Sequence, residues 1–211
     1  VHLRNGATGS VTFLGTVSPA GGNLKEPVTE STKKAARCFY ALSQQRADSK
    51  RYPAIDPLDS YSKYLEYPEI IDYLDSRIEH GWVHDVMKGK TIVQRGKEAA
   101  EQINILGDDG VPVEYHERFW KSELIDFVIL QQDAFDPIDC NTPMERQKYM
   151  FDFVLDICAK SFEFTDFEDC SSFFKQLINL FKQLNYSEWK SERFDQYRNQ
   201  IDTLVANKQT A

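Results

Sequence analysis

One stretch of the sequence differs from everything around it: Arg51-Tyr-Pro-Ala-Ile-Asp-Pro-Leu-Asp-Ser-Tyr-Ser62. It places Pro53 and Pro57 within five positions. The residue before a proline is pushed away from helical backbone angles, so no helix can run through this stretch. A rigid connection of this kind is typical of a shaped site or of a junction between domains. The chain is therefore expected to change character on either side of it.

Upstream, the sequence has the pattern of an α/β sheet. Residues 10–17 (SVTFLGTV) are apolar and β-branched with little alternation, which predicts a strand covered on both faces. The paired glycines of residues 18–23 (SPAGGN) permit positive φ or close approach of a ligand, with an ordinary turn as the alternative. After Pro27, helical spacing predicts a helix of about twenty residues that ends before Tyr52.

Downstream, the apolar residues recur with a helical period. A helix is predicted from Pro68, with a bend or break between Gly81 and Gly96 where the signal fades. Helicity resumes and stops at residues 107–110 (GDDG), whose composition is that of a turn. The next predicted helix carries one apolar face and closes at residues 133–137; that face comprises Trp120, Leu124, Phe127 and Val128.

The last third of the chain is predicted to be entirely helical. No glycine follows Gly110 and no proline follows Pro143, so both common markers of turns are missing. Residues 142–145 (TPME) have the capping-box pattern with proline at the first helical position, which predicts a helix start. Three helices are expected to follow, with apolar stripes at Met150, Phe153, Val154 and Ile157; Phe174, Leu177, Ile178 and Phe181; and Phe194, Tyr197, Ile201 and Leu204.

Composition limits the possible classes of function. With 211 residues and 41% apolar content, the chain can build one good-sized core. Its net charge of −8 argues against a nucleic-acid partner, because proteins that bind the phosphate backbone are usually basic. No stretch approaches the roughly eighteen apolar residues of a membrane helix. The chain begins Val1-His2-Leu3 with no targeting signal, and we expect it to be a piece of something longer.

Motifs for phosphate, metal and redox chemistry are absent or weak. Neither GxxxxGKS/T nor GxGxxG occurs, so nothing in these residues holds a triphosphate unaided. His80 and His84 have the spacing of half a zinc site, but Gly81 weakens the helix and no glutamate lies between them, which favours a solvated pair. Widely spaced cysteines without CxxC predict reduced structural thiols in a cytosolic protein; these are Cys38, Cys140, Cys158 and Cys170.

Three segments together resemble one family. Residues 53–62 resemble the signature of the rotary ATPase hexamer subunits: proline, small, aliphatic, Asp or Asn, three variable positions, then Ser-x-Ser. Residues 18–29 (SPAGGNLKEPVT) and 130–137 (LQQDAFDP) are similar to segments of the catalytic A subunits of V/A-type ATPases. Lys63 stands where the non-catalytic subunits have an arginine, which favours the catalytic family. The departures from the family pattern are Asn23, Tyr52 and Asp133, and no motif is recognised from about Asp75 to Glu101.

The resemblance implies a mainly α fold. A C-terminal helical bundle domain, residues 67–211, would follow the last strand or strands and helix of an α/β P-loop nucleotide-binding domain, residues 1–66. The phosphate-binding lysine and the catalytic glutamate are expected upstream, so no catalytic residue and no metal ligand is assigned here. ATP or ADP with Mg²⁺ would be bound by the full subunit and none by this chain alone.

The resemblance also implies particular sites and partners. An adenine pocket is expected at Tyr52, Pro53, Gln131, Gln132, Ala134 and Phe135. A tip that contacts the central stalk is expected at Gly107, Asp108, Asp109 and Gly110. The implied partners are non-catalytic B subunits in an alternating hexamer and central-stalk subunits, on the cytoplasmic face of a membrane that is touched only indirectly. The alternatives are a helical interaction module that matches by chance and an export-type hexameric ATPase.

Overall fold

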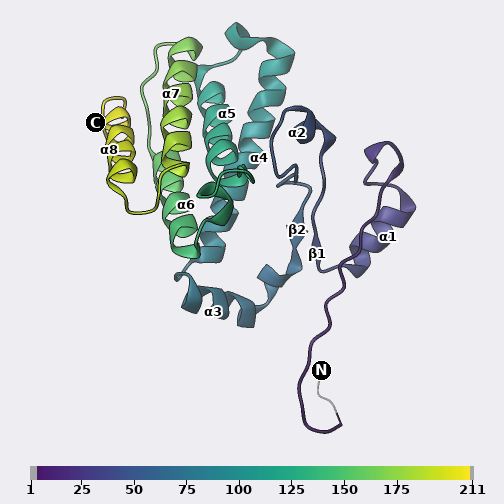
Figure 1. Cartoon of the computed structure of the whole chain (residues 1–211). Coiled ribbons are helices and arrows are strands. Elements are labelled where there is room, and N and C mark those ends of the chain that lie inside the picture. Colours follow the sequence, from purple (N-terminus) through teal and green to yellow (C-terminus); the bar gives the residue numbers. More distant parts are fainter. Residues whose placement is uncertain (1–3, 210–211) are drawn as a thin grey trace. The chain divides into compact units, whose positions relative to one another are not determined.

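The computed structural model describes residues 4–209 and divides into two compact units, Val1–Arg37 and Cys38–Ala211. The first unit contains an extended segment, a 3₁₀ turn η1 (Ala20–Gly22) and helix α1 (Pro27–Ala35) (Figure 1). Thr29 is the single buried residue among its described residues, and its Oγ1 donates to Glu26 Oε1 at 2.9 Å. The boundary at residues 66/67 that the resemblance implies stays a prediction.

The strand predicted at residues 10–17 is wrong. These residues form no strand, and the side chains of Phe13 and Leu14 are 93% and 91% exposed. A strand needs a neighbouring strand to satisfy its backbone N–H and C=O groups. No strand of the described residues pairs with this segment. Its apolar side chains are therefore not buried within the first unit.

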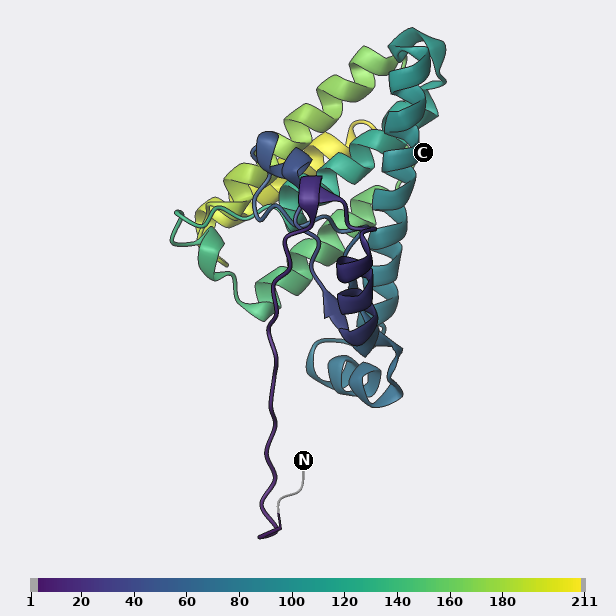
Figure 2. The same cartoon turned by 90° about the vertical axis from the view of Figure 1, so that its right-hand side faces the viewer.

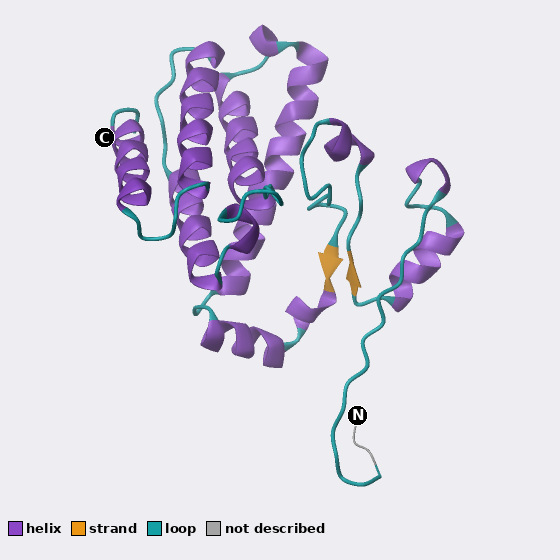
Figure 3. Ribbon diagram, in the orientation of Figure 1, coloured by secondary structure: helices purple, strands orange, loops and turns teal. Residues whose placement is uncertain are grey.

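The helix predicted from Pro27 is also too long. It ends at Ala35, and the following residues form strand β1 (Cys38–Phe39), which pairs antiparallel with β2 (Tyr61–Ser62). A separate bridge joins Leu42 to Ile55, and the short helix α2 (Gln44–Asp48) lies between (Figure 3). Residues 38–42 are extended because they pair with the prolyl stretch. The spacing of apolar residues along the chain does not reveal such a long-range partner.

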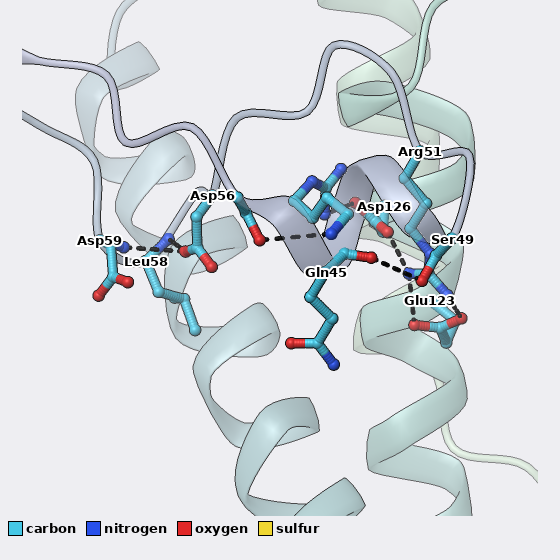
Figure 4. A network of polar contacts seen from close by, with 10 residues as sticks. Gln45, Ser49, Arg51, Asp56, Leu58, Asp59, Glu123 and Asp126 are labelled. Atoms are coloured by element: carbon cyan, nitrogen blue, oxygen red, sulfur yellow. Dashed lines mark hydrogen bonds and ion pairs between the residues drawn. The ribbon is translucent and has the colours of Figure 1, made fainter. Parts of the chain in front are cut away.

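The prolyl stretch, residues 51–62, is held by hydrogen bonds to the segment before it. Ser43 N donates to Ala54 O and Asp56 N donates to Ala41 O, both at 2.8 Å. The carboxylate of Asp56 accepts from the backbone of Leu58 and Asp59 at 2.8 and 2.9 Å, which closes an Asx turn (Figure 4). Side-chain and backbone contacts together thus fix the shape of this connection.

The remainder of the second unit is helical, as predicted. Its long helices are α3 (Pro68–Arg77), α4 (Trp82–Leu106), α5 (Val113–Ile125), α6 (Met144–Ala159), α7 (Phe167–Asn185) and α8 (Glu192–Ala206). Short 3₁₀ turns lie at η2 (Lys63–Glu66), η3 (Asp108–Gly110) and η5 (Asp139–Asn141). Helix α5 continues into one π-helical turn, η4 (Asp126–Leu130).

The predicted break lies at the Gly81 end of the expected range: α3 ends at Arg77, and Gly81, with φ of 89°, precedes α4. From Trp82 through Gly96 there is no break, and Figure 2 shows α4 as one unbroken helix. A Cβ atom on Gly96 would lie 2.0 Å from Ser122 Cβ on α5. On Gly89 it would lie 3.0 Å from the ring of Phe151 on α6. These glycines therefore permit close helix packing instead of ending a helix. Gly107, with φ of 79°, does end α4, as its turn composition predicts.

The core lies among α5, α6, α7 and α8, and the predicted stripes supply it. Fully buried side chains include Leu124, Val154, Phe174, Leu177, Phe181 and Ile201. Helix α6 begins at Met144, one residue after Pro143, but the predicted capping box does not form. Thr142 Oγ1 donates to Asp139 O at 3.0 Å instead, and Glu145 pairs with Lys190 at 2.7 Å, so both capping side chains have other partners.

Candidate functional site

Five of the six residues predicted for the adenine pocket line one hollow in the second unit. The hollow has a volume of about 500 Å³ and is lined by Tyr52, Gln131, Gln132, Ala134 and Phe135, together with Lys50, Phe127, Asp133, Asp139, Lys182, Asn185 and Tyr186. Gln132 N donates to Tyr52 O at 3.0 Å, which joins two segments far apart in sequence. Pro53 lines a neighbouring cavity instead.

Asp139 organises the loop that carries Gln132 and Phe135. Its carboxylate accepts from Asp133 N, and its backbone carbonyl accepts from Gln132 Nε2, both at 2.6 Å. Phe135 N donates to Asp133 Oδ1 at 2.9 Å. Burial raises the pKa of Asp139, while the hydrogen bond from Asp133 acts in the opposite direction. The loop is thus built around one buried carboxyl group.

Two aromatic rings of the hollow present their faces to solvent. Phe135 is 98% exposed, so none of its surface is used for packing within the described residues. Tyr52 is 55% exposed, and its hydroxyl donates to Ala47 O at 3.3 Å, which fixes one end of the ring. Exposed rings of this kind can stack on a planar heteroaromatic group. The chemistry of the hollow therefore suits a nucleobase.

Cations also border the hollow. Lys182 Nζ lies 4.6 Å from the centre of the Phe127 ring, and Arg51 approaches the same ring at 4.7 Å. Lys50, with a φ of 57°, lines the hollow as well. Neither lysine forms an ion pair with a carboxylate of the described residues, so both charges remain available to an anionic ligand.

An ion-pair network connects the segment before Tyr52 to the bundle (Figure 4). The guanidinium of Arg51 donates to both oxygens of Glu123 at 2.9 and 2.7 Å and also pairs with Asp126. Arg46 pairs with the second oxygen of Asp126 at 2.7 Å. The hydrogen bond to Glu123 raises the pKa of Arg51 above its ordinary range. Residues 46–51 are thereby attached to α5 and its π-helical turn.

No motif in the sequence pointed to this network. Its members are separated by the whole length of α3 and α4, and single arginines and acids are common on exposed helices. The one available signal was the position of Arg51 as the first residue of the prolyl stretch.

The predicted tip joins α4 to α5 at the upper end of both helices in Figure 1. Gly107, Asp108, Asp109 and Gly110 are all exposed, and the preceding Ile105 is 75% exposed. Behind the tip, the buried His116 has Nε2 at 3.0 Å from Asp108 O, where it can donate a hydrogen bond, and its ring stacks on Phe167 at 5.4 Å. The acidic tip is therefore held by the contact between His116 and Asp108, while its own four residues are exposed to solvent.

The other sequence candidates occupy ordinary surroundings. His80 is 97% exposed at its side chain and lies 3.1 Å from Asp75, while His84 is exposed on α4. Lys63 lies over the Tyr61 ring at 5.6 Å. The cysteines are free, and no group of three or more metal-ligating side chains occurs within residues 4–209. Over the same residues, no helix combines the length and apolar composition of a membrane span.

Comparison with known proteins defines the class. A sequence profile of the ATP synthase alpha/beta family, nucleotide-binding domain, matches residues 2–62. A solved ATP synthase subunit, NeqB of Nanoarchaeum equitans, has a TM-score of 0.49 and 21% identity over 67% of this chain and 33% of that one. The chain is homologous to members of the ATP synthase alpha/beta family, and the profile covers two of the three matching segments, residues 18–29 and 53–62.

Curated relatives narrow the assignment within this family. The V-type ATP synthase alpha chain of Chlamydia pneumoniae is 41% identical over 97% of this chain and 34% of its own length. Those of Chlamydia abortus and Treponema denticola are 38% and 37% identical over 99% of this chain, and over 35% and 33% of their own lengths. The chain corresponds to the C-terminal part of V-type ATP synthase alpha chains and spans about a third of their length.

Proposed function

We propose that this chain is the C-terminal part of the catalytic alpha subunit of a V/A-type rotary ATP synthase or ATPase. In the full subunit it supplies the adenine side of the catalytic nucleotide site and the helical domain that couples ATP hydrolysis or synthesis to rotation of a central stalk. The observation that carries this proposal is the backbone hydrogen bond between Gln132 and Tyr52, which supports one hollow built from both motif segments.

At the nucleotide site, these residues bind and orient the base. An adenine ring between Tyr52 and Phe135 gains about 1–3 kcal/mol per stacked ring. The amides of Gln131 and Gln132 offer hydrogen bonds to its edge. None of these groups can attack a phosphate or stabilise the charge that develops on it, so their effect falls on nucleotide affinity.

The chemical step belongs to the rest of the subunit and to its partners. Upstream residues would hold the triphosphate and Mg²⁺ and orient the attacking water, and non-catalytic B subunits would alternate with this subunit in a hexamer on the cytoplasmic face of the membrane. Coupling would move protons or sodium ions through the membrane sector. The chain alone is expected to have no ATPase activity, because it contains no phosphate-binding loop.

In this proposal, α5 links movement of the loop that carries Gln132 and Phe135 to movement of the tip. The helix begins just after the tip, and its π-helical turn ends directly before Gln131. A displacement of the base loop on nucleotide closure would therefore reach the tip along one rigid element. Packed helices move between discrete arrangements, so a two-state rigid-body shift is expected, with the acidic tip in contact with the stalk.

The test uses the complete complex with two variants. Phe135→Ser should raise the KM for ATP about tenfold by loss of one stacked ring, and ions moved per ATP should not change. Replacement of both tip aspartates, Asp108→Ser with Asp109→Ser, should leave the KM unchanged and lower the number of ions moved per ATP. Unchanged coupling in the tip variant, or magnesium-dependent ATP turnover by the isolated chain, would contradict the proposal.

A further inference from the structure

A second cavity in the Cys38–Ala211 unit has the size and lining of a small-molecule site. Its volume is about 560 Å³, within the range of about 300–1,000 Å³ that is usual for such sites. Helices α4 and α6 supply Trp82, Val86, Met150 and Phe151, and the prolyl stretch supplies Pro53 and Ile55. Most of the wall is therefore apolar and partly aromatic.

One buried cation lines this apolar wall. Arg146 is 2% exposed, and its Nη2 donates to Leu184 O at 3.1 Å and to Asn185 O at 2.7 Å. Its Nε and Nη1 groups have no hydrogen-bond acceptor among the described residues, and the guanidinium pairs with none of their carboxylates. Burial lowers the pKa of Arg146, while the negative charges of Asp139 and Asp136 act in the opposite direction.

The other charged groups of the wall compensate Arg146 only in part, through the negative charge of Asp139. Lys90 adds a second cation, whose Nζ donates to Ser60 O at 3.3 Å. Asp139 also lines the cavity, but its carboxylate accepts the backbone hydrogen bond from Asp133 that shapes the base loop. The wall thus combines an apolar surface with two cations and one carboxylate, so its charge is positive on balance. A buried cation with unpaired N–H groups is stabilised by a further hydrogen-bonding partner, and a carboxylate accepts a charge-assisted hydrogen bond from a guanidinium.

We propose that this cavity is a binding site for a small amphipathic anion, namely an aromatic monocarboxylate. The ring of the ligand lies against Trp82, Met150 and Phe151, and its carboxylate accepts a charge-assisted hydrogen bond from Nη1 of Arg146. The site does not depend on the proposed function. Four wall residues also line the base hollow: Gln131, Gln132, Asp139 and Asn185. Occupancy of one site therefore changes the affinity of the other for its ligand.

The test titrates the full 211-residue chain with 2-naphthoate and, separately, with the neutral analogue 2-naphthalenemethanol. Calorimetry should give a Kd on the order of 0.1–1 mM for naphthoate, as expected for a ligand with few heavy atoms. The neutral analogue should bind about tenfold more weakly, because it cannot form the charge-assisted pair. In NMR spectra, naphthoate should shift the indole N–H signal of Trp82.

Variants locate the binding. Val86→Trp fills the cavity without altering Arg146 and should abolish naphthoate binding, whereas Ile105→Trp, at an exposed position of the same helix, should leave the Kd unchanged. Arg146→Met should remove the preference for naphthoate over the neutral analogue. If Arg146→Met does not fold, as far-ultraviolet circular dichroism would show, Val86→Trp still decides the question.

Several results would overturn the proposal. Equal affinity for the two probes would remove the role of Arg146, and unchanged binding to a folded Val86→Trp variant would place the probe elsewhere. Absence of binding to the folded chain would remove the site.

Discussion

Burial divides the four thiols into two pairs of different reactivity. Desolvation raises the pKa values of Cys158 and Cys170 to about 12, and both side chains are buried in the core. Cys140 is exposed, and Cys38 is half-buried with its Sγ donating to Ser62 Oγ at 3.1 Å. The thiolate is the reactive form of cysteine, so a raised pKa and burial both slow its reaction.

With Ellman's reagent at pH 8, Cys140 of the native chain should therefore react rapidly and Cys38 more slowly, as followed by the thionitrobenzoate that the reagent releases. Cys158 and Cys170 should react only after denaturant is added. Cys140→Ser should remove the fast phase alone. A native chain whose four thiols react at one rate would show that the packing of α6 and α7 is wrong.

Two aspartates should influence stability in opposite directions as pH changes. Burial raises the pKa of Asp139, so the folded state holds its proton more tightly, and stability falls as pH rises through this folded pKa. The hydrogen bond from Lys208 lowers the pKa of Asp169, so its stabilising effect is present at neutral pH and is lost on acidification.

Urea unfolding at several pH values between about 3 and 7 checks these signs. The stability of Asp139→Asn relative to the unaltered chain should rise with pH, since amide oxygen can still accept from Asp133. That of Asp169→Asn should fall with pH. Two difference curves of the same sign would refute the assigned environments.

The motifs of the sequence identified one side of the base hollow and not the other. Tyr52 and residues 131–135 belong to recognisable segments, whereas Lys182 lies on α7 and Tyr186 directly follows that helix, and no motif marks either residue. They reach the hollow because Asn185 Nδ2 donates to Val128 O at 3.1 Å, which brings the end of α7 against η4. A contact of this kind is set by tertiary packing, so single-sequence patterns do not contain it.

At the scale of elements, periodicity predicted the helices well where one face is buried and failed where a residue has a long-range partner. Helices α6, α7 and α8 bury the stripes that the spacing indicates. Residues 38–42 have helical spacing but are extended, because β1 pairs with β2. The fading signal between Gly81 and Gly96 predicts a bend or break, but Gly89 and Gly96 lie within α4, where the missing side chain permits close packing.

The contact between α4 and α5 should accordingly be sensitive at Gly96. In Gly96→Ala, the new Cβ would lie 2.0 Å from Ser122 Cβ and 3.2 Å from Arg118 O, so the helices must move apart. Overpacking of this kind costs about 1–3 kcal/mol, more than the roughly 1 kcal/mol that alanine gains over glycine in a helix.

Thermal or urea unfolding should therefore show a destabilised Gly96→Ala variant. Adding Ser122→Gly should recover part of the loss, because it removes the atoms that the new methyl group meets. Equal stability of Gly96→Ala and the unaltered chain would mean that α4 and α5 are not in close contact at this point.

At the scale of the whole molecule, the two units differ in how much they bury. The Cys38–Ala211 unit contains the entire hydrophobic core of the described residues, whereas Thr29 is the single buried residue described in Val1–Arg37. Hydrophobic burial is the main term that opposes chain entropy. The first unit therefore gains little free energy from hydrophobic burial, and it should unfold locally at small cost in free energy.

Limited proteolysis tests this difference directly. Chymotrypsin should first cut the native chain after Phe13 or Leu14 and in the loop after Phe135, because all three are more than nine-tenths exposed, and leave a nicked fragment that contains residues 38–211. The aromatic sites of that fragment at Phe174 and Phe181 are 0% exposed and should be cut at least about tenfold more slowly. Phe13→Ser with Leu14→Ser should suppress the cut at these two residues and leave the others unchanged. Cleavage at Phe174 and Phe181 as fast as at Phe13 would show that the bundle is no better ordered than the segment that precedes it. Protection of Phe13 in the native chain would instead show that a partner surface covers residues 10–17.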